Sequence, residues 1–157
     1  MAESVETVVV GAGQAGLSVS YHLKQRGREH VVLERGRIAD TWRTQRWDGF
    51  FLNTPNWAQL LPGHEYRGDD PDGFAPLAEV IAYLDDYATA IGSDVREGVE
   101  VSGLRRESDD GYTIQTDGGV LRAVVGVHWQ HKRKSSLFLG VGEDAEYVAE
   151  DVARGVR

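Results

Sequence analysis

The spacing of apolar and polar residues changes along the chain, and each spacing predicts a helix or a strand. A short β-branched run at residues 7–10 is followed by helical spacing at 14–26, which Gly27 ends, and by a second apolar run at 30–34. Continuous apolar runs of this length are typical of strands buried on both faces. A strand, a helix and a strand in this order predict a right-handed βαβ unit at the start of a parallel sheet.

Periodicity fades from Arg35 to Ala75, where Trp and Pro residues are frequent. A long loop this rich in aromatic residues often covers a ligand. Pro76 then opens a segment with one apolar helical face, and Gly92 closes it, so we expect a core helix between them. Its apolar face consists of Leu77, Val80, Ile81, Leu84, Ala88 and Ile91.

Three short apolar segments follow, at residues 99–105, 112–116 and 120–127, joined by the turn sequences SDDG and DGG. This pattern predicts a three-stranded antiparallel meander. A last helix is expected from about 141 to 155, with Glu143 and Asp144 in its first turn, where the helix dipole favours acids. The inward residues of that helix are Val141, Ala145, Val148, Ala149 and Val152.

The composition narrows the class of protein. A chain of 157 residues fits one domain that buries roughly 68–70% of its unfolded surface. The chain has 17 basic and 25 acidic residues and a net charge of −8. This charge argues against binding to nucleic acid or to anionic membranes, because both require a basic surface. No cysteine is present, which excludes disulfides, thiolate metal sites and a redox-active Cys pair. No apolar signal segment or membrane span is visible, so we expect a cytoplasmic protein whose redox chemistry, if any, belongs to a cofactor.

The most informative motif is TVVVGAGQAG at residues 7–16, a strand that leads directly into G-x-G-x-x-G. Gly11 suits the tight turn, Gly13 allows the backbone to approach a pyrophosphate, and Gly16 lets the helix lie close to the strand. The helix N-terminus, beginning with Gln14 and Ala15, favours an anion through its free N–H groups and its dipole.

Glu34 follows eighteen residues after Gly16, at the end of the second apolar run. A carboxylate at that point accepts hydrogen bonds from both hydroxyls of an adenosine ribose and repels a 2′-phosphate. The glycine motif and this acid together predict a dinucleotide site, and the alternative is a βαβ unit whose glycines serve packing alone.

These segments resemble the FAD-binding domain of the flavin-containing monooxygenase-like oxidoreductases, which are flavoproteins with two dinucleotide-binding domains. The resemblance covers the N-terminal two thirds of the chain, in VVVGAGQAGLSVSYHLKQRG, VVLERG, DTWRTQRWDGFFLNTPNWAQLLPG, FAPLAEVIAYLDDYA and GVEVSGL. It implies an α/β, Rossmann-like three-layer domain, with a parallel sheet and an antiparallel meander, that binds FAD. It also implies that the glycine loop binds the pyrophosphate and that Glu34 binds the adenosine ribose. The segment Thr41-Trp42-Arg43 would lie along the diphosphate and ribityl, Asn53 and Thr54 would approach the isoalloxazine ring, and Val101 would offer backbone hydrogen bonds to adenine.

The C-terminal stretch GVHWQHKRKSSLFLGVGEDAEYVAEDVA resembles the end of the same family, where a final strand passes the flavin ribityl and leads into a closing helix. That resemblance adds Gly126, Ser136 and Leu137 to the candidate cofactor-binding residues. In the family, a whole NAD(P)H-binding domain separates the two halves, whereas here residues 1–123 and 124–157 meet within LRAVVGVHW.

We interpret the chain as a single FAD-binding domain from which the NAD(P)H-binding domain has been deleted. One strand, at about residues 120–127, then serves both halves. The surface that the missing domain would have covered is expected to form an apolar patch, through which a homo-oligomer could assemble.

Several candidate residues carry two interpretations. Arg35 either is a solvated charge or stacks on adenine, and Trp42 packs either on the cofactor or in the core. Arg43 is expected beside the diphosphate, where its charge would offset two negative charges. Asn53 suits either the edge of the flavin or a turn. Ser136, with its neighbours in SSL, precedes N–H groups that would meet the flavin pyrimidine oxygen, or caps the last helix, and the two roles are compatible.

The basic segment HWQHKRK is interpreted as a solvated loop near the cofactor, because two histidines without acidic or cysteine ligands make a poor metal site. No residue receives a catalytic role. The leading interpretation is a minimal flavoprotein with at most weak redox activity, and the alternative is a non-catalytic dinucleotide-binding structural module. A nicotinamide-dependent dehydrogenase is disfavoured, since no substrate domain and no catalytic His or Tyr-Lys arrangement is visible.

Overall fold

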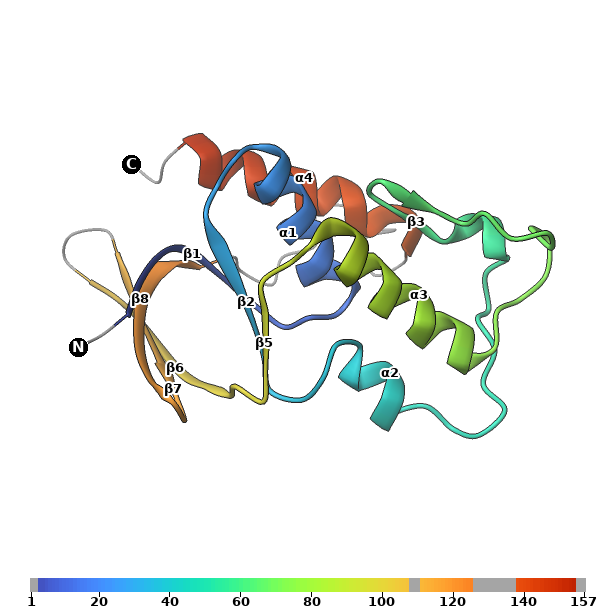
Figure 1. The fold of residues 1–157 in the computed structure, drawn as a ribbon, viewed down its shortest axis with the longest axis horizontal. Coiled ribbons are helices and arrows are strands. Elements are labelled where there is room, and N and C mark those ends of the chain that lie inside the picture. Colours follow the sequence, from blue (N-terminus) through green and yellow to red (C-terminus); the bar gives the residue numbers. More distant parts are fainter. Residues whose placement is uncertain (1–2, 108–110, 126–137, 155–157) are drawn as a thin grey trace.

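The structure is a computed structural model that describes residues 3–107, 111–125 and 138–154. It contains a six-stranded sheet in the order β5-β2-β1-β8-β7-β6 and a separate two-stranded hairpin (Figure 1). The strands of the large sheet are β1 (Glu3–Val10), β2 (His30–Glu34), β5 (Val95–Glu97), β6 (Val101–Arg106), β7 (Tyr112–Thr116) and β8 (Gly119–Val125). The main helices are α1 (Gln14–Gln25), α2 (Asp40–Thr44), α3 (Leu77–Ile91) and α4 (Phe138–Arg154).

The parallel half of the sheet is centred on β1. This strand pairs in parallel with β2 along one edge and with β8 along the other, and β2 pairs in parallel with β5. The predicted βαβ unit is confirmed, although β1 begins at Glu3 rather than at residue 7. β5 was not predicted, because three residues are too few to show a strand period.

The predicted meander is also present, and it continues the sheet. β7 pairs antiparallel with both β6 and β8, while the other edge of β8 pairs in parallel with β1. A single strand therefore closes the meander and extends the parallel sheet, as predicted for residues 120–127. The described part of this strand ends at Val125.

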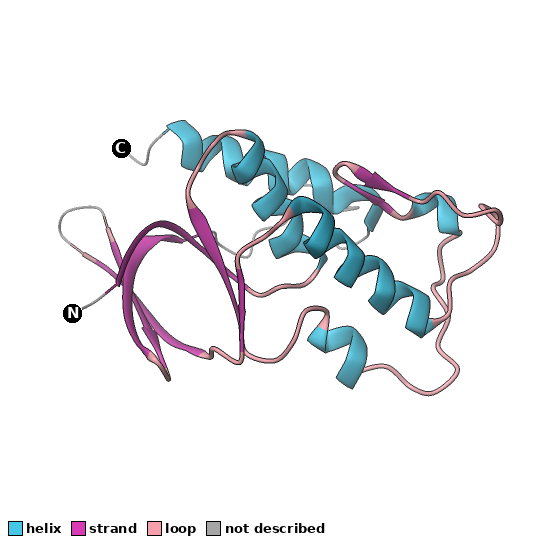
Figure 2. Cartoon of the chain, in the orientation of Figure 1, coloured by secondary structure: helices cyan, strands magenta, loops and turns pink. Residues whose placement is uncertain are grey.

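The large sheet is strongly curved, and β6, β7 and β8 lie away from the helices (Figure 2). Both faces of the parallel strands are covered by other parts of the chain. On one face, α1, α3 and α4 bury a core that includes Leu17, Leu84 and Ala149. On the other face, Val8 and Leu33 pack with Ile114 of β7 in a second core. This arrangement confirms the predicted three-layer α/β fold.

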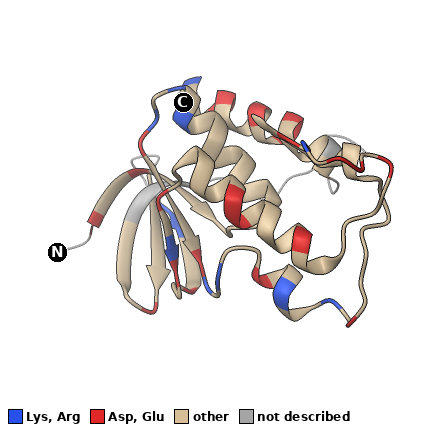
Figure 3. Ribbon diagram, turned by 45° about the vertical axis from the view of Figure 1, so that its right-hand side comes forward, with Lys and Arg blue, Asp and Glu red and all other residues tan. Residues whose placement is uncertain are grey.

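The helical layer follows the predicted apolar faces. Val80, Leu84 and Ala88 of α3 are buried, as are Val141 and Ala149 of α4. However, α4 begins at Phe138, three residues before the predicted start, because the Phe138 side chain is only 4% exposed and packs in the core. None of the described helices combines the length and apolar character needed to cross a bilayer. Acidic and basic positions are interspersed over the described elements (Figure 3).

The prediction that residues 35–75 lack regular structure is wrong in part. This segment contains the short helix α2, a 3₁₀ turn at Asn56–Ala58, and a hairpin of β3 (Leu60–Leu61) with β4 (His64–Glu65). Elements of two to five residues are too short for a hydrophobic period to reveal.

The hairpin is fixed by a tyrosine from α3. The Tyr83 hydroxyl accepts a hydrogen bond from the Leu61 N–H at 3.1 Å, and the carbonyls of Gln59 and His64 are acceptors for its proton. The Asn56 and Gln59 side chains are buried and bonded to each other at 3.0 Å. Side-chain hydrogen bonds thus support a hairpin whose own ladder has only the pairs Leu60–Glu65 and Leu61–His64.

The same segment displays aromatic side chains on its outer side. Phe51 pairs with Pro76 in an isolated antiparallel bridge, and Phe51 and Phe74 are 56% and 51% exposed. The alternate residues Leu52 and Ala75 are buried, which fixes the outward face. Trp47 is 68% exposed. Association of two copies through such a surface stays a prediction.

Burial raises the pKa of Tyr83 from 10.0 to about 12, although the Leu61 N–H works in the opposite direction. Because the pKa in the folded state lies above that in the unfolded state, the stabilising contribution of Tyr83 is complete below pH 10 and is lost between pH 10 and 12. We expect the free energy of unfolding, measured in urea at several pH values, to fall less steeply between pH 10 and pH 12 in Tyr83→Phe than in the wild type. Equal slopes for the two proteins would contradict this prediction.

Candidate dinucleotide site

The turn after β1 has the two structural features that its first and third glycines predicted. Gly11 has a φ of 97°, which favours glycine, and its N–H donates to the Leu33 carbonyl at 2.8 Å. A Cβ atom at Gly16 would lie 1.9 Å from the Gly11 carbonyl oxygen. Gly11 therefore makes the turn, and Gly16 permits α1 to pack against it.

Gly13 differs from both, because nothing in the part of the chain that the structure describes requires a glycine there. Its φ is −89°, and a Cβ atom would meet nothing within 4 Å. Gly13 is the N-cap of α1 but provides no side-chain hydrogen bond, and the first turn, which includes Gln14 and Ala15, contains no acid. The open space and the uncapped helix N-terminus suit the close approach of a phosphate anion.

A cleft of ≈ 330 Å³ lies at the carboxyl ends of β1 and β2, beside this turn. Open parallel sheets bind ligands at this position. The cleft brings together residues that are far apart in sequence, including Glu34 and Val101. The full lining consists of Val10, Gly11, Leu33, Glu34, Arg35, Asp40, Thr41, Val99, Glu100 and Val101.

Glu34 is 8% exposed, and both carboxylate oxygens accept backbone hydrogen bonds. Oε2 accepts from the Ala12 N–H at 2.8 Å, and Oε1 accepts from the Gly36 N–H at 2.9 Å. The Glu34 carbonyl accepts from the Val99 N–H at 2.9 Å. Each carboxylate oxygen has a second acceptor position, so the orientation fixed by the backbone leaves capacity for ligand hydroxyls.

The connection after β2 is fastened to its neighbours through its backbone. The Ala39 N–H donates to the Ala12 carbonyl at 3.1 Å, and the Ile38 N–H donates to Glu97 Oε1 at 2.7 Å. Ala39 is 1% exposed and has a φ of 61°, a strained conformation for a residue with a Cβ atom. Surrounding contacts thus impose the shape of this loop beside the glycine turn.

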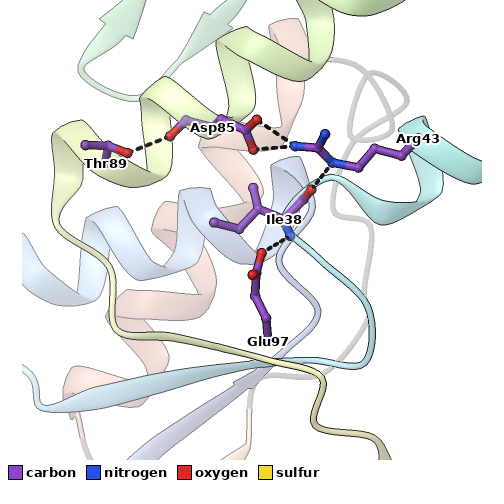
Figure 4. A network of polar contacts seen from close by, with 5 residues as sticks. All are labelled: Ile38, Arg43, Asp85, Thr89 and Glu97. Atoms are coloured by element: carbon purple, nitrogen blue, oxygen red, sulfur yellow. Dashed lines mark hydrogen bonds and ion pairs between the residues drawn. The ribbon is translucent and has the colours of Figure 1, made fainter.

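The structure places Arg43 against α3. Its Nη2 donates to both oxygens of Asp85, at 2.8 and 2.6 Å, and its Nε donates to the Ile38 carbonyl at 2.9 Å. Figure 4 shows this network, which Thr89 extends by donating to the Asp85 carbonyl. Contact between Arg43 and a diphosphate stays a prediction, and in this structure the guanidinium links α2 to α3.

Trp42 is partly buried, packs against the apolar core and is absent from the lining of the cleft. Its ring stacks on Phe138 at a centroid distance of 5.8 Å and an interplanar angle of 19°. Phe50 meets the same ring edge-on, and the Arg46 guanidinium lies 4.6 Å from its centroid. Of the two interpretations of Trp42, the geometry favours core packing.

The remaining candidates divide into three groups. Arg35 is exposed and is the one cation among the described residues that line the cleft. Asn53 and Thr54 lie outside this cleft, in the long connection near Phe51. The last three candidates, Gly126, Ser136 and Leu137, lie outside the described residues.

Sequence reasoning missed five residues of the cleft, which are Val10, Leu33, Asp40, Val99 and Glu100. Thr41 was included only as part of a segment along the diphosphate. Proximity to Val101 was the one signal that could have identified Val99 and Glu100. Among the described residues, no group of three or more His, Cys, Asp or Glu side chains is arranged to hold a metal ion.

A glycine turn, a buried acid at the end of the next strand and a cleft between them define a dinucleotide-binding α/β domain. Comparison with known proteins agrees with this class. The chain belongs to the family described as pyridine nucleotide-disulphide oxidoreductase, which matches residues 8–125.

An uncharacterized CzcO-like oxidoreductase from Geobacillus kaustophilus (strain HTA426) is 37% identical over 120 residues, or 76% of this chain and 34% of that protein. This chain thus spans about a third of that relative's length. A flavin-containing monooxygenase from Stenotrophomonas maltophilia superimposes with a TM-score of 0.68 at 27% identity, over 78% of this chain and 37% of its own. The enzyme OTEMO, in complex with FAD and NADP, has a TM-score of 0.66 at 20% identity, over 83% of this chain and 28% of its own, which is a likeness of fold.

Gly16 and Gly13 predict different effects of an added methyl group. In Gly16→Ala the Cβ atom would overlap the Gly11 backbone, so the free energy of unfolding should fall by about 3 kcal/mol or more. In Gly13→Ala it should change by about 1 kcal/mol or less, while the affinity for a dinucleotide such as FAD falls at least tenfold. Urea unfolding and calorimetric titration measure the two quantities. Unchanged affinity in Gly13→Ala would contradict close approach of the ligand at this residue.

Proposed function

We propose that this chain is a minimal FAD-binding flavoprotein domain that holds the ADP half of FAD in the cleft at the ends of β1 and β2. The observation that carries the proposal is the pairing of Gly13 with Glu34. None of the described residues requires a glycine at position 13, and Gly13 lies two residues from Gly11, which lines the same cleft as Glu34. The similarity to a flavin-containing monooxygenase supports FAD as the dinucleotide.

Each region of the cleft suits one part of FAD. The N-terminus of α1 would bind the pyrophosphate through its N–H groups. Glu34 would accept hydrogen bonds from the ribose hydroxyls, and the backbone of Val101 would meet adenine. When bound, FAD supplies redox chemistry that the cysteine-free chain lacks.

The outer face of the long connection is where we propose that the isoalloxazine end lies. Phe51 and Phe74 expose apolar rings beside the exposed Asn53, whose amide can both donate and accept hydrogen bonds. A planar ring system would cover such a face, and an amide at its edge would satisfy ring oxygen and nitrogen atoms.

We further propose that the chain is a single domain that has lost the NAD(P)H-binding domain of its family. The support is the double pairing of β8, which joins the meander to the parallel sheet without an intervening domain. Without that domain nothing orients a nicotinamide against the flavin, and orientation accounts for a large part of the rate of such a transfer. Redox turnover with NADPH should therefore be weak.

A non-catalytic dinucleotide-binding module is the second candidate. Glu34 and the N-terminus of α1 would bind the ADP half that FAD and NAD share, whether or not the bound cofactor undergoes a redox reaction. In a non-catalytic module the dinucleotide would contribute stability alone.

FAD binding is tested by calorimetric titration of the protein after removal of any bound flavin. We expect one FAD per chain, competition by ADP, and much weaker binding of FMN, which lacks the adenosine half. At an FAD concentration one hundred times its dissociation constant, the free energy of unfolding should rise by about 2.7 kcal/mol. FMN binding as tight as that of FAD would overturn the assignment of the cleft to the ADP half.

Reducibility distinguishes the two candidates. We expect dithionite to bleach the visible absorption of the bound flavin, whereas NADPH should bleach it slowly and without saturation in the micromolar range. A bound flavin that resists dithionite would favour the structural module. Saturable NADPH oxidation with a KM in the micromolar range would contradict the loss of nicotinamide binding.

A further inference from the structure

The carboxylate of Glu34 joins two loops of the backbone. One partner is the Ala12 N–H, inside the glycine turn, and the other is the Gly36 N–H, in the connection after β2. The two distances, 2.8 and 2.9 Å, are those of charge-assisted hydrogen bonds. Glu34 therefore forms a bridge between the loops, which we call the Glu34 bridge.

Both polar backbone groups of Ala12 are committed to neighbouring segments. Its N–H donates to Glu34, and its carbonyl accepts from the Ala39 N–H at 3.1 Å. On the other side of the turn, the Gly11 N–H is held by the Leu33 carbonyl. Residues 11 and 12 are thus fixed from three sides, and the backbone beginning at Gly13 faces the open space.

Contacts of this kind restrict the conformations that a turn containing glycine can adopt. Glycine loses more conformational freedom on ordering than any other residue, and this turn has glycines at positions 11 and 13. A ligand that needs one loop shape binds with an apparent affinity reduced by the fraction of molecules in that shape. A side chain that fixes the shape in advance therefore raises affinity without touching the ligand.

We propose that Glu34 is a positioning residue for the pyrophosphate-binding turn, separately from any contact with the ribose hydroxyls. The proposal rests on the proposed function, since it concerns affinity at the same cleft. The Glu34 bridge holds the glycine turn in its binding shape through Ala12, and the Gly36 bond holds the carboxylate in place. Its contribution should persist for a ligand that has no ribose hydroxyls.

Glu34→Gln tests this separation. The amide keeps the size of the side chain but turns an –NH₂ group toward one of two N–H donors, so one bond of the bridge is lost. Dissociation constants are measured calorimetrically for ADP and for 2′,3′-dideoxy-ADP, with the wild type and the variant. We expect the variant to bind dideoxy-ADP roughly tenfold more weakly than the wild type does. Equal affinities of the two proteins for dideoxy-ADP would overturn the proposal.

Glu97→Gln is the matched control. Glu97 also accepts a backbone hydrogen bond, from the Ile38 N–H, but it is not among the described residues that line the cleft. Its substitution should leave both affinities within about twofold of the wild type. A tenfold loss in this variant would mean that any loosening of residues 35–39 impairs binding, which contradicts a specific role for the Glu34 bridge.

Amide hydrogen exchange of the ligand-free wild type gives a second readout if Glu34→Gln does not fold. The Ala12 and Gly36 amides should be protected, because both hydrogen bonds exist before a ligand binds. Rapid exchange at both amides would overturn the Glu34 bridge. Failure of the wild type to bind ADP would instead overturn the proposed function, so the two failures are distinguishable.

Discussion

The pairing of β1 on both edges is the constraint on which the structure depends. With β2 on one side and β8 on the other, the strand satisfies its backbone groups in the centre of the sheet. Both of its faces are covered, by the helices and by the curled meander, so its side chains contribute to two cores. The glycine turn directly follows the C-terminal end of β1, so the position of this strand also sets the position of the cleft. The same strand pairing therefore contributes to stability and determines where the cleft lies.

The cleft itself is built from backbone more than from side chains. The loops that leave β1, β2 and β5 are joined by N–H groups that bond to carbonyls or to carboxylates. Such contacts depend on loop shape and tolerate wide variation in the exposed side chains. A flavin-binding cleft of this kind would be rigid before its cofactor arrives, which reduces the entropy lost on binding.

The sequence predicted the elements that have long or regular periods. The βαβ unit, α3 and the meander were identified because their apolar residues repeat often enough to separate a helix from a strand. The short elements α2 and β5 were missed for the opposite reason. Site residues whose role depends on the local backbone, such as Gly11 and Gly16, were readable from the motif. The contacts of residues whose partners lie far along the chain could not be predicted from the motif. Arg43 pairs with Asp85, and Trp42 stacks on Phe138, only because tertiary packing brings these residues together.

The order of strands has a consequence for how these molecules behave when crowded. An open sheet has two edges, and unpaired edges are templates on which other chains can add and aggregate. One edge here is β5, which is three residues long and contains Arg96. The other is β6, whose last two residues are Arg105 and Arg106. Two copies that paired β6 edge to edge in parallel register would bring Arg105 and Arg106 of one copy beside those of the other, so charge repulsion opposes this mode of growth into larger sheets.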